Sequence, residues 1–162
     1  MLAATGGDLQ LLATDVEEFR LKPLRENLLR AGGKDVQVAR HDWTQPCPVA
    51  LKAAFDAVLL DVPCSNSGVL QRRVDARWRL SEEEFERLAQ LQLTILEQAC
   101  EAVRPGGRLV YSTCSIDAEE DSGVVQKFLT LHPEFSLVND YLALPHREQA
   151  DGAYAALLQR EK

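Results

Sequence analysis

The sequence predicts an α/β domain built on a mostly parallel, twisted β-sheet with helices on both faces. Short apolar runs, which are typical of strands, alternate along the chain with longer stretches that repeat apolar residues at helical spacing. The 162 residues, 46% of them hydrophobic, are enough for one domain with its own core. We therefore expect a single domain over residues 1–162.

The first elements expected are a strand, a helix and a second strand. Leu9 to Ala13 is an apolar run that ends at Thr14-Asp15, and the amphipathic stretch after it stops at Gly32-Gly33. Pro23 fits best in the first turn of a helix, so the firm part of this helix is expected to begin near it. Val36 to Ala39 alternates apolar and polar residues and predicts the second strand.

The middle of the chain predicts a buried strand and a long helix. Phe55 to Leu60 is a continuous apolar run, which suits a central strand buried on both faces. Ser81 and Glu84 have the spacing of a capping box, with Ser81 as the N-cap. Apolar residues then recur at helical spacing until Arg104-Pro105-Gly106-Gly107 ends the helix.

The last third predicts three further strands and one helix. Arg108 to Thr113 is expected to be a strand, and a helix from about Ala118 to Leu131 is closed by a proline. Two weaker strands are expected near Phe135 to Val138 and Ala153 to Leu158. Ligands of open α/β sheets bind beyond the carboxyl ends of the strands, so the residues that follow each strand are the candidates for chemistry.

Composition argues against several classes of protein. No apolar run approaches the roughly 18 residues of a membrane span, and Met1 to Ala4 lacks the basic residues of a signal peptide, so we expect a cytoplasmic protein. The four cysteines form no Cys-x-x-Cys pair, and no histidine cluster completes a zinc site, so no metal is expected. A disulfide framework is improbable in the cytosol.

The formal charge of −7 argues against nonspecific nucleic-acid binding by the chain as a whole. The local distribution differs, because residues 71–80 carry four arginines against one aspartate. Two interpretations remain open for this segment. It is either a solvated arginine face or a surface where arginine pairs with RNA phosphates and Trp78 stacks on an unpaired base.

Two cysteines each follow a predicted strand. Asp61-Val62-Pro63-Cys64-Ser65 continues a buried strand, and Tyr111-Ser112-Thr113-Cys114-Ser115 repeats this arrangement 50 residues later. A thiol that only packs in a core would more often lie inside the strand. Cys64 and Cys114 are therefore the candidate reactive pair, while Cys47 and Cys100 have ordinary loop and helix settings. Asp61 is either part of the site or a cap of its strand.

Two further carboxylates follow predicted strands. Asp15 stands between a strand and a helix, where a carboxylate can accept hydrogen bonds from both hydroxyls of a nucleotide ribose. An aspartate at such a junction is as often a helix N-cap. Asp42, within His41-Asp42-Trp43, suits a turn when taken alone.

The motifs together resemble the Sun (Fmu) family of S-adenosylmethionine-dependent RNA cytosine-5 methyltransferases. The matching segments follow one another through nearly the whole chain and are Asp61 to Ser65, Val69 to Trp78, Arg104 to Gly107, Tyr111 to Ser115, Glu119-Glu120, His132 to Phe135 and Asp151 to Tyr154. This resemblance implies a Rossmann-like class I methyltransferase fold. It also implies S-adenosylmethionine as the cofactor and RNA, foremost ribosomal RNA, as the substrate.

The resemblance also implies roles for individual residues. Cys114 would be the thiolate that adds to carbon 6 of cytosine, and Cys64 would assist release of the product. Asp61 would lie beside cofactor and base, and the Pro63 carbonyl would accept from the cytosine amino group. Asp15 and Asp42 match the positions that bind the cofactor ribose and adenine. The surface presented to RNA would include Arg72, Arg77 and Trp78.

The family's first strand and glycine-rich loop should precede Leu9, and Thr5-Gly6-Gly7 lacks the residues of that loop. We therefore expect an amino-terminally truncated sheet with exposed apolar surface, possible self-association through that surface, and weak or no activity. One alternative is a noncatalytic RNA-binding or assembly module that retains the fold. Another is a thiol redox protein that uses Cys64 and Cys114 as a dithiol.

Overall fold

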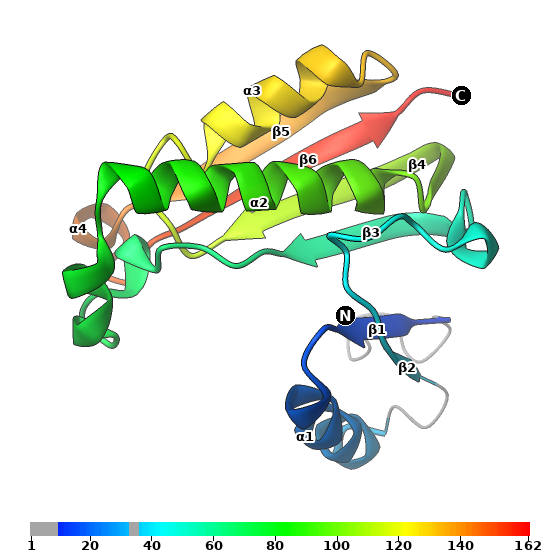
Figure 1. Ribbon diagram of the computed structural model, residues 1–162, viewed down its shortest axis with the longest axis horizontal. Coiled ribbons are helices and arrows are strands. Elements are labelled where there is room, and N and C mark those ends of the chain that lie inside the picture. Colours follow the sequence, from blue (N-terminus) through cyan, green and yellow to red (C-terminus); the bar gives the residue numbers. More distant parts are fainter. Residues whose placement is uncertain (1–9, 33–35) are drawn as a thin grey trace. The chain divides into compact units, whose positions relative to one another are not determined.

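The computed structural model describes residues 10–32 and 36–162 (Figure 1). Thr5-Gly6-Gly7 and the start of the strand predicted from Leu9 lie outside the described residues. The chain divides between Asp42 and Trp43 into two compact units, Met1–Asp42 and Trp43–Lys162.

The first unit is a strand, a helix and a strand. Strand β1 (Leu12–Asp15) pairs in parallel with β2 (Gln37–Arg40), with Leu12 opposite Gln37, and helix α1 (Glu18–Arg30) connects them. Parallel strands need such a crossover connection. The predicted order of these elements is confirmed.

Helix α1 begins earlier than expected. It starts at Glu18, and Pro23 lies inside it, so the prediction that its firm part begins near Pro23 is wrong. The proline removes only the hydrogen bond that its own N–H would donate to the Phe19 carbonyl. Leu21, which precedes Pro23, is fully buried, and its packing stabilises the first turns of α1.

The second unit contains a four-stranded sheet in the order β3-β4-β6-β5. Strand β4 runs parallel to β3, whereas β6 is antiparallel to both β4 and β5. Three of the four strands therefore share one direction, as expected for a mostly parallel sheet. The strand bounds are β3 Phe55–Asp61, β4 Val103–Thr113, β5 Phe135–Ala143 and β6 Ala153–Arg160.

Helices α2 (Glu82–Cys100) and α3 (Ser122–Leu131) both cover the same face of this sheet (Figure 1). The two faces of the sheet therefore differ within this unit, because α2 and α3 pack on one of them. The difference is visible in β3, where Leu60 is 7% exposed and its neighbour Leu59 is 55% exposed. The expectation of a strand buried on both faces is wrong within this unit.

Local hydrogen bonds determine where α2 and α3 begin. The Ser81 hydroxyl accepts from the Glu84 N–H at 3.2 Å, so Ser81 is the N-cap of α2 as predicted. The Glu84 carboxylate does not complete a capping box but pairs with Arg87. Helix α3 begins later than expected because the residues before it form a turn, closed by the Gly123 N–H on the Ala118 carbonyl.

In the part of the chain that the structure describes, four short helices accompany the longer elements. They are η2 Val49–Leu51, η3 Ser67–Val69, η4 Val74–Arg79 and α4 Pro145–Glu148. Across residues 10–32 and 36–162, none of the helices has the length and apolarity needed to cross a membrane. In the same ranges no group of three or more His, Cys, Asp and Glu side chains is arranged to hold a metal ion.

Candidate active site

The thiols of Cys64 and Cys114 meet at the carboxyl edge of β3 and β4. Their Sγ atoms are 2.9 Å apart, and both cysteines are free thiols. The two strands run in parallel with Asp61 opposite Ser112, so both chains leave the sheet at the same edge. The Val62 N–H donates to the Ser112 carbonyl at 3.1 Å and extends this pairing toward Cys64.

The short distance makes the two thiols differ in acidity. Either thiol can donate in this contact; a hydrogen bond donated by the Cys64 thiol lowers the pKa of Cys114 to about 7, although burial and the Asp61 charge act in the opposite direction. The same hydrogen bond, together with burial, raises the pKa of Cys64. Cys114 is therefore the more acidic sulfur of the pair and the one that ionises first.

We expect alkylation of Cys114 by iodoacetamide to rise with pH through an apparent pKa near 7, because only the thiolate reacts. Removing the hydrogen-bond donor in Cys64→Ala should shift this profile to higher pH. Peptide mass spectrometry would follow each cysteine separately. Buried Cys47 and Cys100 serve as internal references, since burial raises the pKa of both. An identical Cys114 profile with and without the Cys64 thiol would contradict the assignment.

Two buried side chains hold the backbone on both sides of Cys64. The Glu120 carboxylate accepts from the Ser65 N–H at 2.9 and 3.3 Å, and from Gln92 Nε2 at 2.8 Å. Gln92 Nε2 also donates to the Pro63 carbonyl at 2.9 Å. Both side chains are fully buried. The residues before and after Cys64 are therefore fixed from α2 and from the turn before α3.

Tyr111 connects this network to the sheet. Its hydroxyl lies 3.0 Å from Gln92 Oε1 and 2.5 Å from the Glu120 carbonyl oxygen, and these two acceptors share its single proton. Gln92 thus has both its carbonyl and its amide engaged, and the buried polar groups satisfy one another. Gln92 and Glu120 were not among the residues predicted for the site. A glutamine on the apolar face of α2, and the Glu119-Glu120 pair of the resemblance, were the available signals.

We expect Glu120→Ala to lower the free energy of unfolding by roughly 2–4 kcal/mol, because it leaves the Ser65 N–H and one of the two N–H groups of the Gln92 amide buried without an acceptor. Glu119 is exposed and adjacent, so Glu119→Ala is the matched control, with an expected change within about 0.5 kcal/mol. Urea denaturation measures both. Equal effects of the two substitutions would show that the buried network does not stabilise the loop.

A glycine contact fixes the backbone at Cys114. The Gly68 N–H donates to the Cys114 carbonyl at 2.9 Å, and the Gly152 N–H donates to the Gly68 carbonyl at 2.8 Å. A Cβ atom on Gly68 would lie 2.3 Å from the Gly152 carbonyl oxygen, so a side chain cannot be accommodated there without moving backbone. The loop after Cys64, the residue Cys114 and the start of β6 are thereby tied together.

Asp61 and Pro63 lie beside the thiols. Asp61 is the last residue of β3, and its carboxylate is near enough to act on the ionisation of Cys114. The Pro63 carbonyl accepts one hydrogen bond, from Gln92, and a carbonyl oxygen has a second lone pair for another donor.

The three residues predicted to contact RNA lie on and before η4. Arg72 forms an ion pair with Asp151 at 2.9 Å. The Arg77 guanidinium lies 5.6 Å from the centre of the Trp78 ring, in cation–π geometry, and Trp78 itself is 83% exposed. An exposed indole of this kind is available for stacking.

Asp15 and Asp42 belong to the first unit. Asp15 Oδ1 accepts from the Glu17 N–H at 2.8 Å, and Asp15 Oδ2 lies 3.8 Å from Arg20. Asp15 is not the N-cap of α1, because that position is Glu17, so the N-cap interpretation of Asp15 is wrong. The Asp15 carboxylate instead closes a turn just before the helix and keeps lone pairs for further donors. Asp42 follows β2 and is partly exposed.

Comparison with known proteins gives the same family along the whole chain. The family model described as 16S rRNA methyltransferase RsmB/F matches residues 1–159. Ribosomal RNA small subunit methyltransferase B of Klebsiella pneumoniae (strain 342) is 38% identical over 159 residues, and that of Vibrio cholerae is 39% identical over 158 residues. These matches cover 93% and 94% of this chain, which spans 37% and 36% of the length of those relatives.

Comparison with solved structures supports the same assignment. The crystal structure of PH0851 has a TM-score of 0.87 and 38% identity, covering 94% of this chain and 37% of that one. The structure of NSun6 from Pyrococcus horikoshii has a TM-score of 0.81 and 27% identity, covering 94% of this chain and 42% of that one. The Rossmann-like fold and the resemblance to Sun proteins are confirmed. The chain belongs to the RsmB/F family of 16S rRNA methyltransferases.

Proposed function

We propose that this chain carries the catalytic site of an S-adenosylmethionine-dependent methyltransferase that modifies carbon 5 of cytosine in ribosomal RNA in the cytoplasm. The observation that carries the proposal is the thiol pair, with Sγ atoms 2.9 Å apart and the pKa of Cys114 lowered to about 7. The family description and the names of the relatives support ribosomal RNA as the substrate. The match over residues 1–159 supports one catalytic domain comprising both units.

The chemistry at carbon 5 requires a nucleophile on the enzyme. Carbon 5 of cytosine is too poor a nucleophile to take a methyl group unaided. Addition of the Cys114 thiolate to carbon 6 moves electron density to carbon 5, which would then take the methyl group that S-adenosylmethionine supplies when bound. Loss of the carbon 5 proton re-forms the double bond and expels the Cys114 thiolate.

Cys64 is placed to assist the second half of this reaction. Its pKa is raised chiefly by the hydrogen bond to Cys114. Once Cys114 is bonded to carbon 6, it no longer carries a thiolate, and this cause of the raised Cys64 pKa is removed. Cys64 then loses its own proton to solvent more easily, and the resulting thiolate accepts the carbon 5 proton, directly or through water. Addition and elimination thus use different members of the pair.

The Pro63 carbonyl is the element that favours cytosine over uracil. Its free lone pair accepts from the cytosine amino group, whereas uracil presents a carbonyl oxygen that cannot donate. Gln92 holds this carbonyl at 2.9 Å, and Glu120 holds the other side of the cysteine loop. These two residues act on the position of Pro63 and Cys64 and do not themselves contact the base.

The carboxylates at the strand ends fit the cofactor chemically. When bound, S-adenosylmethionine supplies an electrophilic methyl group. Asp15 would accept hydrogen bonds from its ribose hydroxyls, and Asp42 would accept from its adenine amine. Asp61, the last residue of β3, is the carboxylate whose charge acts on the Cys114 thiol. The NSun6 structure was determined with SFG, an analogue of this cofactor, which supports a cofactor site in this fold.

The proposal is tested by incubating the protein from the complete reading frame with a 16S ribosomal RNA transcript and S-adenosylmethionine. Mass spectrometry of the digested RNA should then detect 5-methylcytosine and no 5-methyluracil. A noncatalytic RNA-binding module would bind the transcript and leave its cytosines unmodified, which would refute the enzyme assignment.

A further inference from the structure

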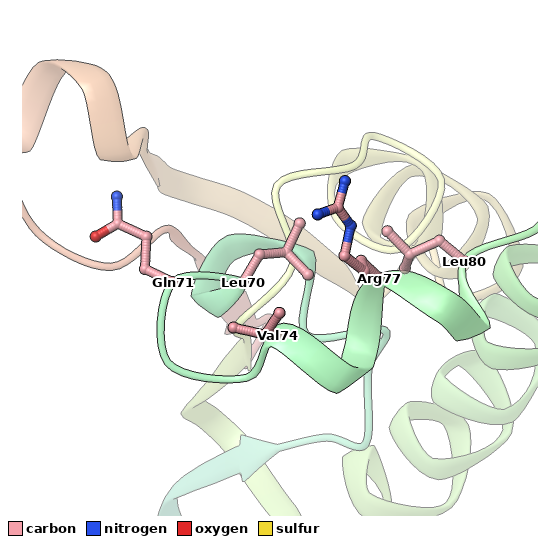
Figure 2. Close-up of a pocket in the computed structure, with 5 residues that line it drawn as sticks. All are labelled: Leu70, Gln71, Val74, Arg77 and Leu80. Atoms are coloured by element: carbon pink, nitrogen blue, oxygen red, sulfur yellow. The ribbon is translucent and has the colours of Figure 1, made fainter.

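A groove beside the thiol pair has no role in the mechanism above. It is lined by Leu70, Gln71, Val74, Arg77 and Leu80, and Figure 2 shows these side chains along the segment from η3 to the end of η4. Its volume is about 540 Å³, within the range of about 300–1,000 Å³ that is usual for small-molecule sites. Three aliphatic side chains line it together with one amide and one guanidinium.

The groove adjoins the candidate active site. Leu80 lines it and also lines the pocket formed by Cys64, Ser65, Asn66, Arg79 and Glu84. A strand with one base at the cysteines therefore passes Leu80 to reach the groove. Because the two sites share the Leu80 side chain, the nucleotide next to the target is the one that an RNA strand bound at the cysteines would bring to the groove.

The charges of the segment favour an anionic ligand. Arg72 pairs with Asp151 and Arg79 pairs with Asp75, at 2.9 and 3.1 Å. Among the residues that the structure describes, no carboxylate pairs with Arg77, whose guanidinium lies over Trp78. Arg77 is thus available for a phosphate at the mouth of the groove.

Exposed apolar surface accompanies this charge. Val74 is 58% exposed and Trp78 is 83% exposed, in an otherwise basic segment. Exposed apolar groups rimmed by polar ones are typical of binding sites. Aliphatic walls and an indole suit the flat face of a nucleobase, which is accessible only when that base is unpaired and unstacked.

We propose that this groove, defined by Leu70, Gln71, Val74, Arg77 and Leu80, is a second RNA subsite that takes the unpaired base adjacent to the target cytosine. The inference rests on the proposed function and extends it to the flanking nucleotide. The aliphatic side chains contact the face of the base, Arg77 pairs with its phosphate, and Gln71 offers a donor and an acceptor to its edge.

The test compares the binding of short labelled RNAs by wild-type and variant proteins. Each RNA contains one cytosine, and the nucleotide on the 5′ or on the 3′ side of that cytosine is either intact or abasic. Fluorescence anisotropy measures their affinity for the protein from the complete reading frame. One abasic position should weaken binding by about 5- to 150-fold, which is the loss of one stacked base. Val74→Asn should weaken binding of the intact RNA and reduce this abasic penalty. Val138→Asn is the matched control, because Val138 lies on β5 and is similarly exposed, at 56%.

Two results would overturn the subsite. One is an abasic penalty that is the same in wild type and Val74→Asn. The other is an equal loss of affinity in Val74→Asn and Val138→Asn. Formation of 5-methylcytosine, assayed on the same RNAs, separates the two proposals. Methylation without any abasic penalty refutes the subsite alone, whereas a coupled penalty without methylation supports the subsite and refutes the enzyme assignment.

Discussion

Cys114→Ala is expected to reduce methyl transfer to cytosine by on the order of 10³-fold or more, because carbon 5 is not activated without addition at carbon 6. The pKa of Cys114, lowered to about 7, makes this sulfur the thiolate of the pair near neutral pH. The measurement is the initial rate of 5-methylcytosine formation, determined by mass spectrometry of digested RNA.

The matched control for this loss is Cys47→Ala. Cys47 is also a free cysteine, it lies before η2, and burial raises its pKa, so it has no part in the proposed chemistry. Its removal should leave the rate of methylation within about threefold of wild type, the scatter expected of a site remote from the chemistry. A Cys114→Ala protein that methylates at the control rate would refute covalent catalysis by this residue.

Cys64→Ala is expected to trap the protein on its RNA. Addition through Cys114 remains possible, but the group that assists loss of the carbon 5 proton is gone, so the covalent intermediate accumulates. A band that combines protein and RNA should persist on a denaturing gel in the presence of S-adenosylmethionine, while turnover falls. The measured quantity is the fraction of RNA in that band at a fixed time.

The double variant Cys64→Ala with Cys114→Ala should form no such band, because the attacking sulfur is absent. Adducts that persist in Cys114→Ala but not in Cys64→Ala would reverse the two roles. The pH profile of alkylation would then show which of the two cysteines has the lower pKa, since the more acidic sulfur is expected to be the one that attacks.

The meeting of the two thiols could be anticipated from the sequence. Each cysteine follows an apolar strand by a few residues, and strands that pair in parallel deliver such residues to one edge. The N-cap of α2 could be predicted equally well, because it depends on Ser81 and the residues just after it. Features fixed by short stretches of chain are those that a sequence predicts well.

Features fixed by distant contacts were not anticipated. Gln92 and Glu120 come from separate elements and meet only when α2 and the turn before α3 pack on the same face of the sheet. The ion pair of Arg72 with Asp151 joins residues that are far apart in the sequence of the second unit. The burial of β3 on one face depends in the same way on where the helices lie.

The most direct measurement of covalent attack by Cys114 uses RNA with 5-fluorocytidine at the target position. Addition at carbon 6 and methylation at carbon 5 leave a fluorine that cannot depart as a proton does, so elimination stops and the protein stays attached. Peptide mapping of this complex should find the modified nucleotide on Cys114, and complex formation should require S-adenosylmethionine. A nucleotide attached to Cys64, or methylation of ordinary cytosine without any trapped complex, would contradict the mechanism.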